Sequence, residues 1–337
     1  MPVSIAIVGP PGSGKTTLFN ALTGGRGADG VGMVDVPDER LERLAGAVHP
    51  RRVVPAQVRL ADAPPGSRAQ RIAAAREADV VIKLVRCFGP QPDPVADLEG
   101  LELDLALTDL ASVEKRLDVV GREVRAGRKQ GAGELAALER AKAHLDEGRA
   151  LATLTLDDEA TGHLSPLFPV SAKPSVVIAN VGEDLLPDGG DPAEHVRRFA
   201  AERGWRALVV DARLEAELGE LDAADALEMR QTYGLTDASL DAVARAVWDA
   251  GGLITFFTAG EPEVRAWPCE AEAPAPVAAG VIHSDFEKHF IRAEVTSVDE
   301  LVAAGSMEAL RSAGRLRVEG REYGVHDGDV VFFRVGR

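Results

Sequence analysis

The chain has 337 residues, with 38 basic and 54 acidic side chains and a formal net charge of −16. At roughly 150 residues per domain this length indicates two or three domains, and 45% hydrophobic residues can fill a substantial core. No run reaches the roughly 20 apolar residues of a membrane span, and two distant cysteines predict neither a disulfide framework nor a zinc site. The acidic balance and the 4% of aromatic residues disfavour general nucleic-acid binding. We therefore expect a cytoplasmic protein with no membrane partner and no affinity for duplex DNA.

Short apolar runs predict strands in the first 250 residues, and helical patterns lie between most of them. The predicted strands cover residues 4–8, 53–60, 80–88, 176–179 and 207–210. The helical patterns cover residues 17–22, 38–47 and 192–203. Strands that alternate with helices are typical of a layered α/β domain with a mostly parallel sheet.

A long helical segment interrupts this alternation between about residues 97 and 157. Its apolar residues step by three and four along two stripes, which are Leu103, Ala106, Leu110, Val113, Leu117, Val120 and Val124, and then Leu135, Leu138, Ala141 and Leu145. The stripes predict an antiparallel helical hairpin with its turn near residues 127–133. Two ordinary helices packed on the sheet are the alternative.

The pattern changes again from about residue 252. Short strands are predicted at residues 253–258, 280–283, 291–295, 316–318 and 330–335, with one helix near residues 297–304 and a proline-rich loop at 274–276. Short strands separated by turns predict a separate small α+β domain.

A phosphate-binding motif lies near the N-terminus. The segment Gly-Pro-Pro-Gly-Ser-Gly-Lys-Thr at residues 9–16 matches the P-loop pattern G-x-x-x-x-G-K-[ST], and it lies between a predicted strand and a predicted helix, as this motif requires. In such a loop the backbone amides surround the phosphates, the lysine reaches the β- and γ-phosphates, and the hydroxyl residue binds Mg²⁺. The candidate nucleotide-binding residues here are Gly9, Gly12, Ser13, Gly14, Lys15, Thr16 and Thr17.

Two strand ends supply further candidates. Asp62 ends a predicted strand, where an aspartate holds Mg²⁺ in P-loop proteins, so Thr16 and Asp62 form the predicted metal site; a solvated aspartate is the alternative.

Asn180 and Glu183 follow another predicted strand, at the place where G proteins recognise guanine with the motif N-K-x-D. Because Val181 replaces the lysine and Glu183 is one methylene longer than aspartate, guanine should lose its advantage. An ordinary loop is the alternative here.

One basic cluster lies near the predicted hairpin turn of this acidic chain. It consists of Arg122, Arg125, Arg128 and Lys129. Such a cluster can contact nucleic-acid phosphates. A solvated helix end, with cations near its C-terminus, explains the cluster equally well.

These motifs together resemble the Obg-like ATPase (YchF) family of P-loop proteins over nearly the whole chain. The similarity is strongest in residues 253–337, where Thr-Phe-Phe-Thr-Ala-Gly-Glu at 255–261 and AAGVIHSDFEKHFIRAEV at 278–295 are similar to the family's C-terminal TGS domain. The resemblance implies a G domain in residues 1–92 and 165–250, a coiled-coil insertion in 93–164, and a ubiquitin-like (β-grasp) TGS domain in 251–337.

The resemblance also has functional implications. It implies binding of ATP in preference to GTP, slow hydrolysis and association with ribosomes. Asn-Val-Gly-Glu at 180–183 matches the family's ATP-selecting motif, and Ala212 joins the nucleotide-binding candidates. Ribosomal RNA contact would come from the basic cluster and from the TGS-like domain, through Arg311, Arg315, Arg317 and Arg321.

The chain departs from the family at the places that sense or cleave the γ-phosphate. Gly12 replaces an asparagine that is expected to help hold a monovalent cation, and residues 23–36 are too short for the family's switch I segment. After Asp62 the chain passes almost directly into a predicted helix at 68–78, without the long glycine-rich switch II. The loop at 89–95 lacks the family's catalytic histidine. We therefore assign no catalytic residue.

Three functions are compatible with the motifs. The first is a translation-associated ATPase with weak hydrolysis. The second is a nucleotide-binding scaffold or regulatory protein that does not hydrolyse ATP. The third is a small-molecule kinase, which is disfavoured because no arginine-rich lid follows the core and because it does not account for the TGS-like end.

Overall fold

The computed structural model describes residues 3–62, 68–126, 131–235 and 239–336. The chain divides into two compact units. The P-loop unit comprises Ser4–Gly32 and Leu60–Val243, and the C-terminal unit comprises Met1–Val3, Met33–Arg59 and Ala244–Arg337. No helix in the described part of the chain is long and apolar enough to cross a membrane.

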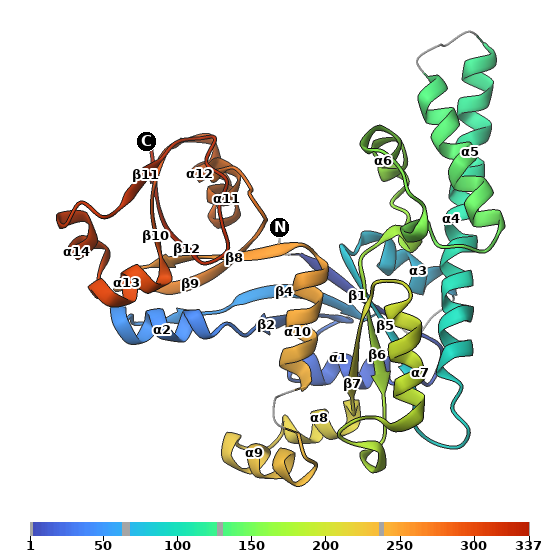
Figure 1. Cartoon of the computed structure of the whole chain (residues 1–337), viewed down its shortest axis with the longest axis horizontal. Helices are drawn as coiled ribbons and strands as arrows, with labels where there is room; N and C mark the ends of the chain where they lie inside the picture. Colours follow the sequence, from blue (N-terminus) through green and yellow to red (C-terminus); the bar gives the residue numbers. More distant parts are fainter. Residues whose placement is uncertain (1–2, 63–67, 127–130, 236–238, 337) are drawn as a thin grey trace. The chain divides into compact units, whose positions relative to one another are not determined.

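The P-loop unit is a layered α/β structure (Figure 1). Its elements are β1 (Ser4–Val8), α1 (Lys15–Thr23), α3 (Arg68–Glu77), β5 (Val80–Arg86), α4 (Pro94–Arg125), α5 (Ala132–Asp146), α6 (Asp158–Leu164), β6 (Ser175–Asn180), α7 (Gly190–Ala201), β7 (Arg206–Val210), α8 (Ala212–Leu218) and α9 (Ala223–Thr232). The boundary between the units falls within β2 (Val31–Val36), β4 (Ala56–Asp62) and α10 (Ser239–Ala250).

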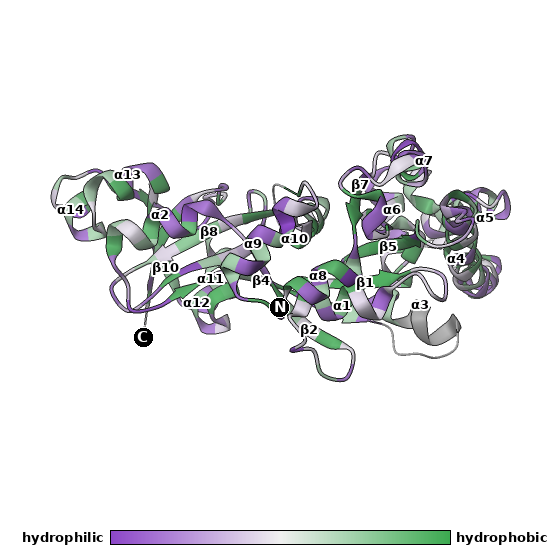
Figure 2. Ribbon diagram, turned by 90° about the horizontal axis from the view of Figure 1, so that it is seen from below, coloured by the Kyte–Doolittle hydropathy of each residue, from purple (hydrophilic) through white to green (hydrophobic). Residues whose placement is uncertain are grey.

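One six-stranded sheet has the order β2-β4-β1-β5-β6-β7. Its strands β1, β5, β6 and β7 lie wholly in the P-loop unit and pair in parallel. Every residue of β6, and all of β5 except its last, is buried. Parallel strands covered on both faces read as continuous apolar runs, and β5 is accordingly green in Figure 2. The structure confirms the predicted α/β class.

Helices α4 and α5 form the predicted antiparallel hairpin (Figure 1). Asp93 caps α4 by accepting from the backbone N–H of Ala96, and Pro94 occupies the first turn, where a missing N–H carries no cost. The predicted stripes meet in one apolar cluster that contains Ala106, Val113, Val120, Leu138, Ala141 and Leu145. Leu103 is an exception, since it is 46% exposed. Residues 127–130 of the predicted turn, with Arg128 and Lys129, lie outside the described residues.

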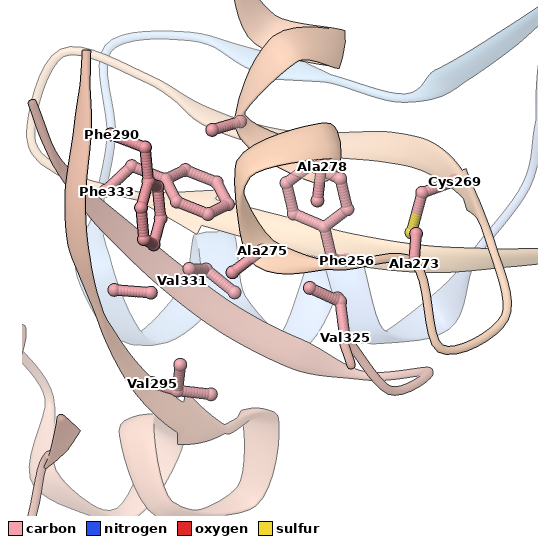
Figure 3. Close-up of a cluster of buried hydrophobic side chains, with 12 residues drawn as sticks. Phe256, Cys269, Ala273, Ala275, Ala278, Phe290, Val295, Val325, Val331 and Phe333 are labelled. Carbon is pink, nitrogen blue, oxygen red and sulfur yellow. The ribbon is translucent and has the colours of Figure 1, made fainter. Parts of the chain in front are cut away.

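The C-terminal unit is built on a second six-stranded sheet with the order β11-β10-β12-β8-β9-β3. Its elements are α2 (Glu39–Val48), β3 (Val53–Val54), β8 (Leu253–Ala259), β9 (Val264–Glu270), α11 (Ala275–Ile282), α12 (Ser284–Lys288), β10 (Phe290–Ser297), α13 (Val298–Ala304), α14 (Met307–Ser312), β11 (Arg317–Glu319) and β12 (Asp329–Val335). The alanines of α11 pack over Phe256, and Phe290 and Phe333 complete the same core (Figure 3).

The predicted strand at 280–283 and the predicted loop at 274–276 are wrong, because α11 covers all of both segments except the cap residues Pro274 and His283. Pro274 precedes this helix and Pro276 lies in its first turn, a position that tolerates proline. Ala275, Ala278 and Ala279, spaced three and four apart, are fully buried. A short apolar run does not distinguish a buried helix from a strand, and here the small side chains fit a helix lying on the sheet.

The single strand predicted at 53–60 is two strands in the structure. Pro55 separates β3 from β4, and the two strands enter different sheets. Proline lacks the backbone N–H that a continuous strand would use. Strands β2 and β9 were not predicted at all.

Candidate nucleotide-binding site

The loop between β1 and α1 has the backbone of a phosphate cradle. Gly12 and Gly14 adopt left-handed conformations, with φ of 77° and 95°, which a residue with a Cβ adopts only under strain. A Cβ atom on Gly9 would collide with the carbonyl oxygen of Leu84 in β5. Helix α1 begins at Lys15, directly after this turn. Left-handed glycines that lead into a helix N-terminus form an anion-binding concavity.

The side chains of the P-loop motif take different positions. Lys15 Nζ donates to the carbonyl oxygens of Gly9, at 3.1 Å, and Pro10, at 2.8 Å. Ser13 is fully buried, and within the described part of the chain its Oγ has no hydrogen-bond partner. Thr17 is half-buried in the first turn of α1.

Asn180 connects the P-loop with two other elements. Its Nδ2 donates to the carbonyl oxygen of Ser13 at 2.8 Å, and its Oδ1 accepts from the backbone N–H of Ala212 at 3.0 Å. Asn180 is buried at the end of β6, and Ala212 is the first residue of α8. A Cβ on Gly14 would collide with Asn180 Nδ2, so this contact also requires a glycine. The sequence pattern thus brings Asn180, Ala212 and the P-loop together.

The two predicted metal ligands are in direct contact. Thr16 Oγ1 donates to Asp62 Oδ2 at 2.9 Å. Asp62 is buried, and its Oδ1 has no hydrogen-bond partner among the described residues. A buried carboxylate oxygen without a donor is costly, and oxygen ligands of this kind are those that Mg²⁺ prefers. The residues present therefore fit a magnesium ion.

Glu183 and Val181 have different environments beyond the end of β6. Glu183 is exposed, and its Oε2 accepts from the hydroxyl of Tyr233 at 3.0 Å. Val181 is 2% exposed and packs in the apolar core beside β5 and β6. Sequence reasoning missed Tyr233, because it lies 50 residues from Glu183 and no local spacing connects them.

The predicted basic residues fall into two groups. Arg122 and Arg125 are exposed in the last turn of α4, where each Nε donates to a backbone carbonyl of the same helix. The four arginines that were predicted as RNA contacts in the C-terminal unit are instead bonded to groups of that same unit. Arg311 pairs with Glu294, Arg315 with Glu300 and Arg317 with Asp329, while Arg321 donates to the carbonyl oxygen of Phe290.

Two family models match the chain and define its class. The model described as a 50S ribosome-binding GTPase matches residues 4–122, which include β1, the P-loop and Asp62. The model of the YchF-GTPase C-terminal domain, described as a protein of unknown function, matches residues 253–336. The chain is thus a P-loop protein of the GTPase class with a YchF-type C-terminal domain.

Whole-chain relatives identify the family. The "Ribosome-binding ATPase YchF" of Bacillus subtilis is 34% identical over 363 residues, with 99% of each chain covered. The protein of the same name from Escherichia coli O157:H7 is 36% identical over 354 residues, with 97% of each covered. The solved structure of the Schizosaccharomyces pombe YchF GTPase superposes with a TM-score of 0.90 at 26% identity, over 98% of this chain and 97% of that one. The chain belongs to the YchF family.

Proposed function

We propose that this chain binds ATP with Mg²⁺ at the P-loop, hydrolyses it slowly and associates with ribosomes in the cytoplasm. The observation that carries the proposal is the P-loop itself, with its left-handed Gly12 and Gly14 and the adjacent contact between Thr16 and Asp62. The names of the relatives support the ATPase and ribosome-binding parts. Titration calorimetry with ATP and GTP, with and without Mg²⁺, tests occupancy and base choice together.

Thr16 and Asp62 are the residues that would hold Mg²⁺. A bound Mg²⁺ would neutralise charge on the β- and γ-phosphates. Asp62 Oδ1 is buried without a donor among the described residues, so a cation bound there would satisfy it. Asn180 holds the P-loop backbone beside the first residue of α8 through its two hydrogen bonds. Lys15 supplies the positive charge for the phosphates.

We expect ATP to bind more tightly than GTP, and Glu183→Asp to raise GTP affinity relative to ATP by about threefold to tenfold. The shorter aspartate restores the side chain that pairs with both donors of guanine. Val181→Lys is a poor companion change, because Val181 lies in the core and a lysine there would bury its charge. Calorimetry with both nucleotides measures the ratio.

Glu194→Asp is the matched control for this base-choice test. It makes the same chemical change on α7, where Glu194 pairs with Arg197 at 3.5 Å at the surface. Its variant should leave the ratio of the two affinities unchanged. Tighter binding of GTP than of ATP to the parent protein would contradict the proposed base preference.

Hydrolysis is expected to be at least about tenfold slower than that of the Bacillus subtilis relative, measured side by side as phosphate release. Phosphoryl transfer depends on groups that position water and stabilise charge around the γ-phosphate. The loop at 89–95 contains no histidine, and residues 23–36 are too short for the family's switch I segment. Equal turnover by the two pure proteins would refute this expectation.

A turnover of zero would favour the second candidate, a scaffold that binds ATP without cleaving it. The observation behind this candidate is that the cradle is intact while the sequence elements that act on the γ-phosphate are shortened. Phosphate release that persists in a Lys15→Ala variant would come from a contaminant and count as zero.

Ribosome association is expected to depend on the hairpin tip, defined as Arg122, Arg125, Arg128 and Lys129. These four residues lie within eight consecutive positions of an acidic chain. If they neutralise about four phosphates, the logarithm of the ribosome association constant should fall with the logarithm of the salt concentration at a slope of about −3 to −4. Alanine at all four positions should abolish co-sedimentation with ribosomes at about 0.1 M salt. Co-sedimentation across a salt series with ATP measures the slope.

The control for the tip variant removes four cations elsewhere on the same unit. Arg140, Lys142, Arg149 and Arg197 make surface contacts with neighbouring acids or carbonyls, and such pairs contribute little to stability. If the control and tip variants lose binding equally, general charge explains the effect. If neither loses binding, the tip is only a solvated helix end.

A further inference from the structure

Tyr233 lies outside the P-loop and the Thr16–Asp62 pair. It follows α9 as its C-terminal cap residue, and it packs against the apolar cluster of Leu214, Leu218 and Ala226. This packing aims the hydroxyl at Glu183, where it donates to Oε2 at 3.0 Å. The hydrogen bond to Glu183 raises the pKa of Tyr233, so the hydroxyl remains a donor at neutral pH.

The bases differ in the donors that a carboxylate at this position could accept. Guanine presents N1–H and the exocyclic 2-amino group side by side, and a carboxylate accepts from both only when its two oxygens face them. Hypoxanthine keeps N1–H but lacks the 2-amino group. Adenine has neither of these donors and offers its 6-amino group instead.

The Tyr233 hydroxyl restricts this pairing. It occupies one acceptor position on Glu183 Oε2. Each carboxylate oxygen offers two lone pairs, so a base that pairs with Oε2 has to compete with the Tyr233 hydroxyl or use the one lone pair that remains. Oε1 is the oxygen that stays available for a single donor from a base.

We propose that Tyr233 is a specificity-determining residue that disfavours guanine by engaging the second oxygen of Glu183. This inference rests on the proposed function, in which Glu183 faces the base. It assigns base choice to a pair of residues 50 positions apart rather than to the loop after β6 alone.

A purely structural role for Tyr233 makes a different prediction. The same hydrogen bond links the end of α9 to the loop that follows β6. If that link only stabilised the loop, its loss would weaken all nucleotides by a similar factor. If Tyr233 instead competes with the base for Glu183, its loss changes the affinity only for guanine, the base that pairs with both carboxylate oxygens.

The test compares ATP, ITP and GTP binding to the parent and to Tyr233→Phe by calorimetry with Mg²⁺. ITP carries hypoxanthine, so it differs from GTP by the 2-amino group alone. We expect Tyr233→Phe to tighten GTP binding by about threefold to tenfold, the value of one hydrogen bond, and to leave ATP and ITP within about twofold.

Tyr323→Phe is the matched control. Tyr323 also donates its hydroxyl to a carboxylate, Asp329 Oδ2 at 2.6 Å, but it lies in the C-terminal unit. Its variant should leave all three affinities unchanged. Thermal unfolding of both variants monitors the integrity of the fold.

The outcomes separate this inference from the function on which it rests. Equal shifts for GTP and ITP, or no shift for GTP, would overturn the role of Tyr233 while leaving ATP binding in place. A parent protein that binds none of the three triphosphates would reject the proposed function and this inference with it.

Discussion

Replacing Lys15 with alanine is expected to weaken ATP binding about 100-fold, which corresponds to about 2.7 kcal/mol. Lys15 is the cation of the P-loop motif, and its Nζ lies against the carbonyl oxygens of Gly9 and Pro10 at the mouth of the cradle. Charge-assisted hydrogen bonds to phosphate are roughly twice as strong as neutral ones, and the variant loses them all. Calorimetry with ATP and Mg²⁺ measures the change.

Lys142→Ala is the control for this variant. Lys142 lies on α5 and pairs with Glu114 and Asp146 at the surface, so it removes the same charge from the same unit. ATP affinity should be unchanged in the control. Unchanged ATP affinity in Lys15→Ala would show that the P-loop is not where the nucleotide binds.

The candidate site was predictable where its residues are neighbours in sequence or end parallel strands. The P-loop is one contiguous motif, and Asp62 and Asn180 end β4 and β6. The carboxyl ends of the strands in a parallel sheet meet at one edge, where ligands bind. The pairing of Tyr233 with Glu183 was not predictable, because α9 reaches the loop only through tertiary packing.

The fold was predictable to a similar degree. Long periodic segments such as α4 and buried parallel strands such as β5 have a clear signature. Strand β9 does not, because Arg265, Pro268 and Glu270 interrupt its apolar residues. Pro268 is tolerated because β3 pairs only with Val264 and Arg265, so the missing N–H breaks no ladder on that side.

Replacing Glu102 with glutamine is expected to lower the free energy of unfolding by about 3–5 kcal/mol, because it leaves a buried cation without its partner. Lys83 on β5 is 3% exposed, and its Nζ lies 2.5 Å from Glu102 Oε1 of α4. The same Nζ lies 3.4 Å from the ring centroid of Trp205. Denaturant unfolding followed by circular dichroism measures the loss.

A double variant, Lys83→Met with Glu102→Leu, separates the buried charge from the packing. Apolar residues of similar volume often replace a buried ion pair at no cost. We therefore expect the double variant to recover most of the stability that Glu102→Gln loses. A double variant as unstable as Glu102→Gln would show that shape, rather than the unpaired charge, explains the loss.

The pH dependence of Glu102→Gln provides an independent test of the same charge. Burial lowers the pKa of Lys83, with Arg203 adding to the effect and Glu102 opposing it, so removing Glu102 lowers this pKa further. Between the folded pKa and the unfolded value of about 10.4, the unfolded chain holds the extra proton. Stability therefore rises with pH in this window.

The unfolding free energy of Glu102→Gln should rise toward that of the double variant between neutral pH and about pH 10. If the difference between the two variants stays constant over that range, Lys83 does not titrate and the buried-charge explanation fails.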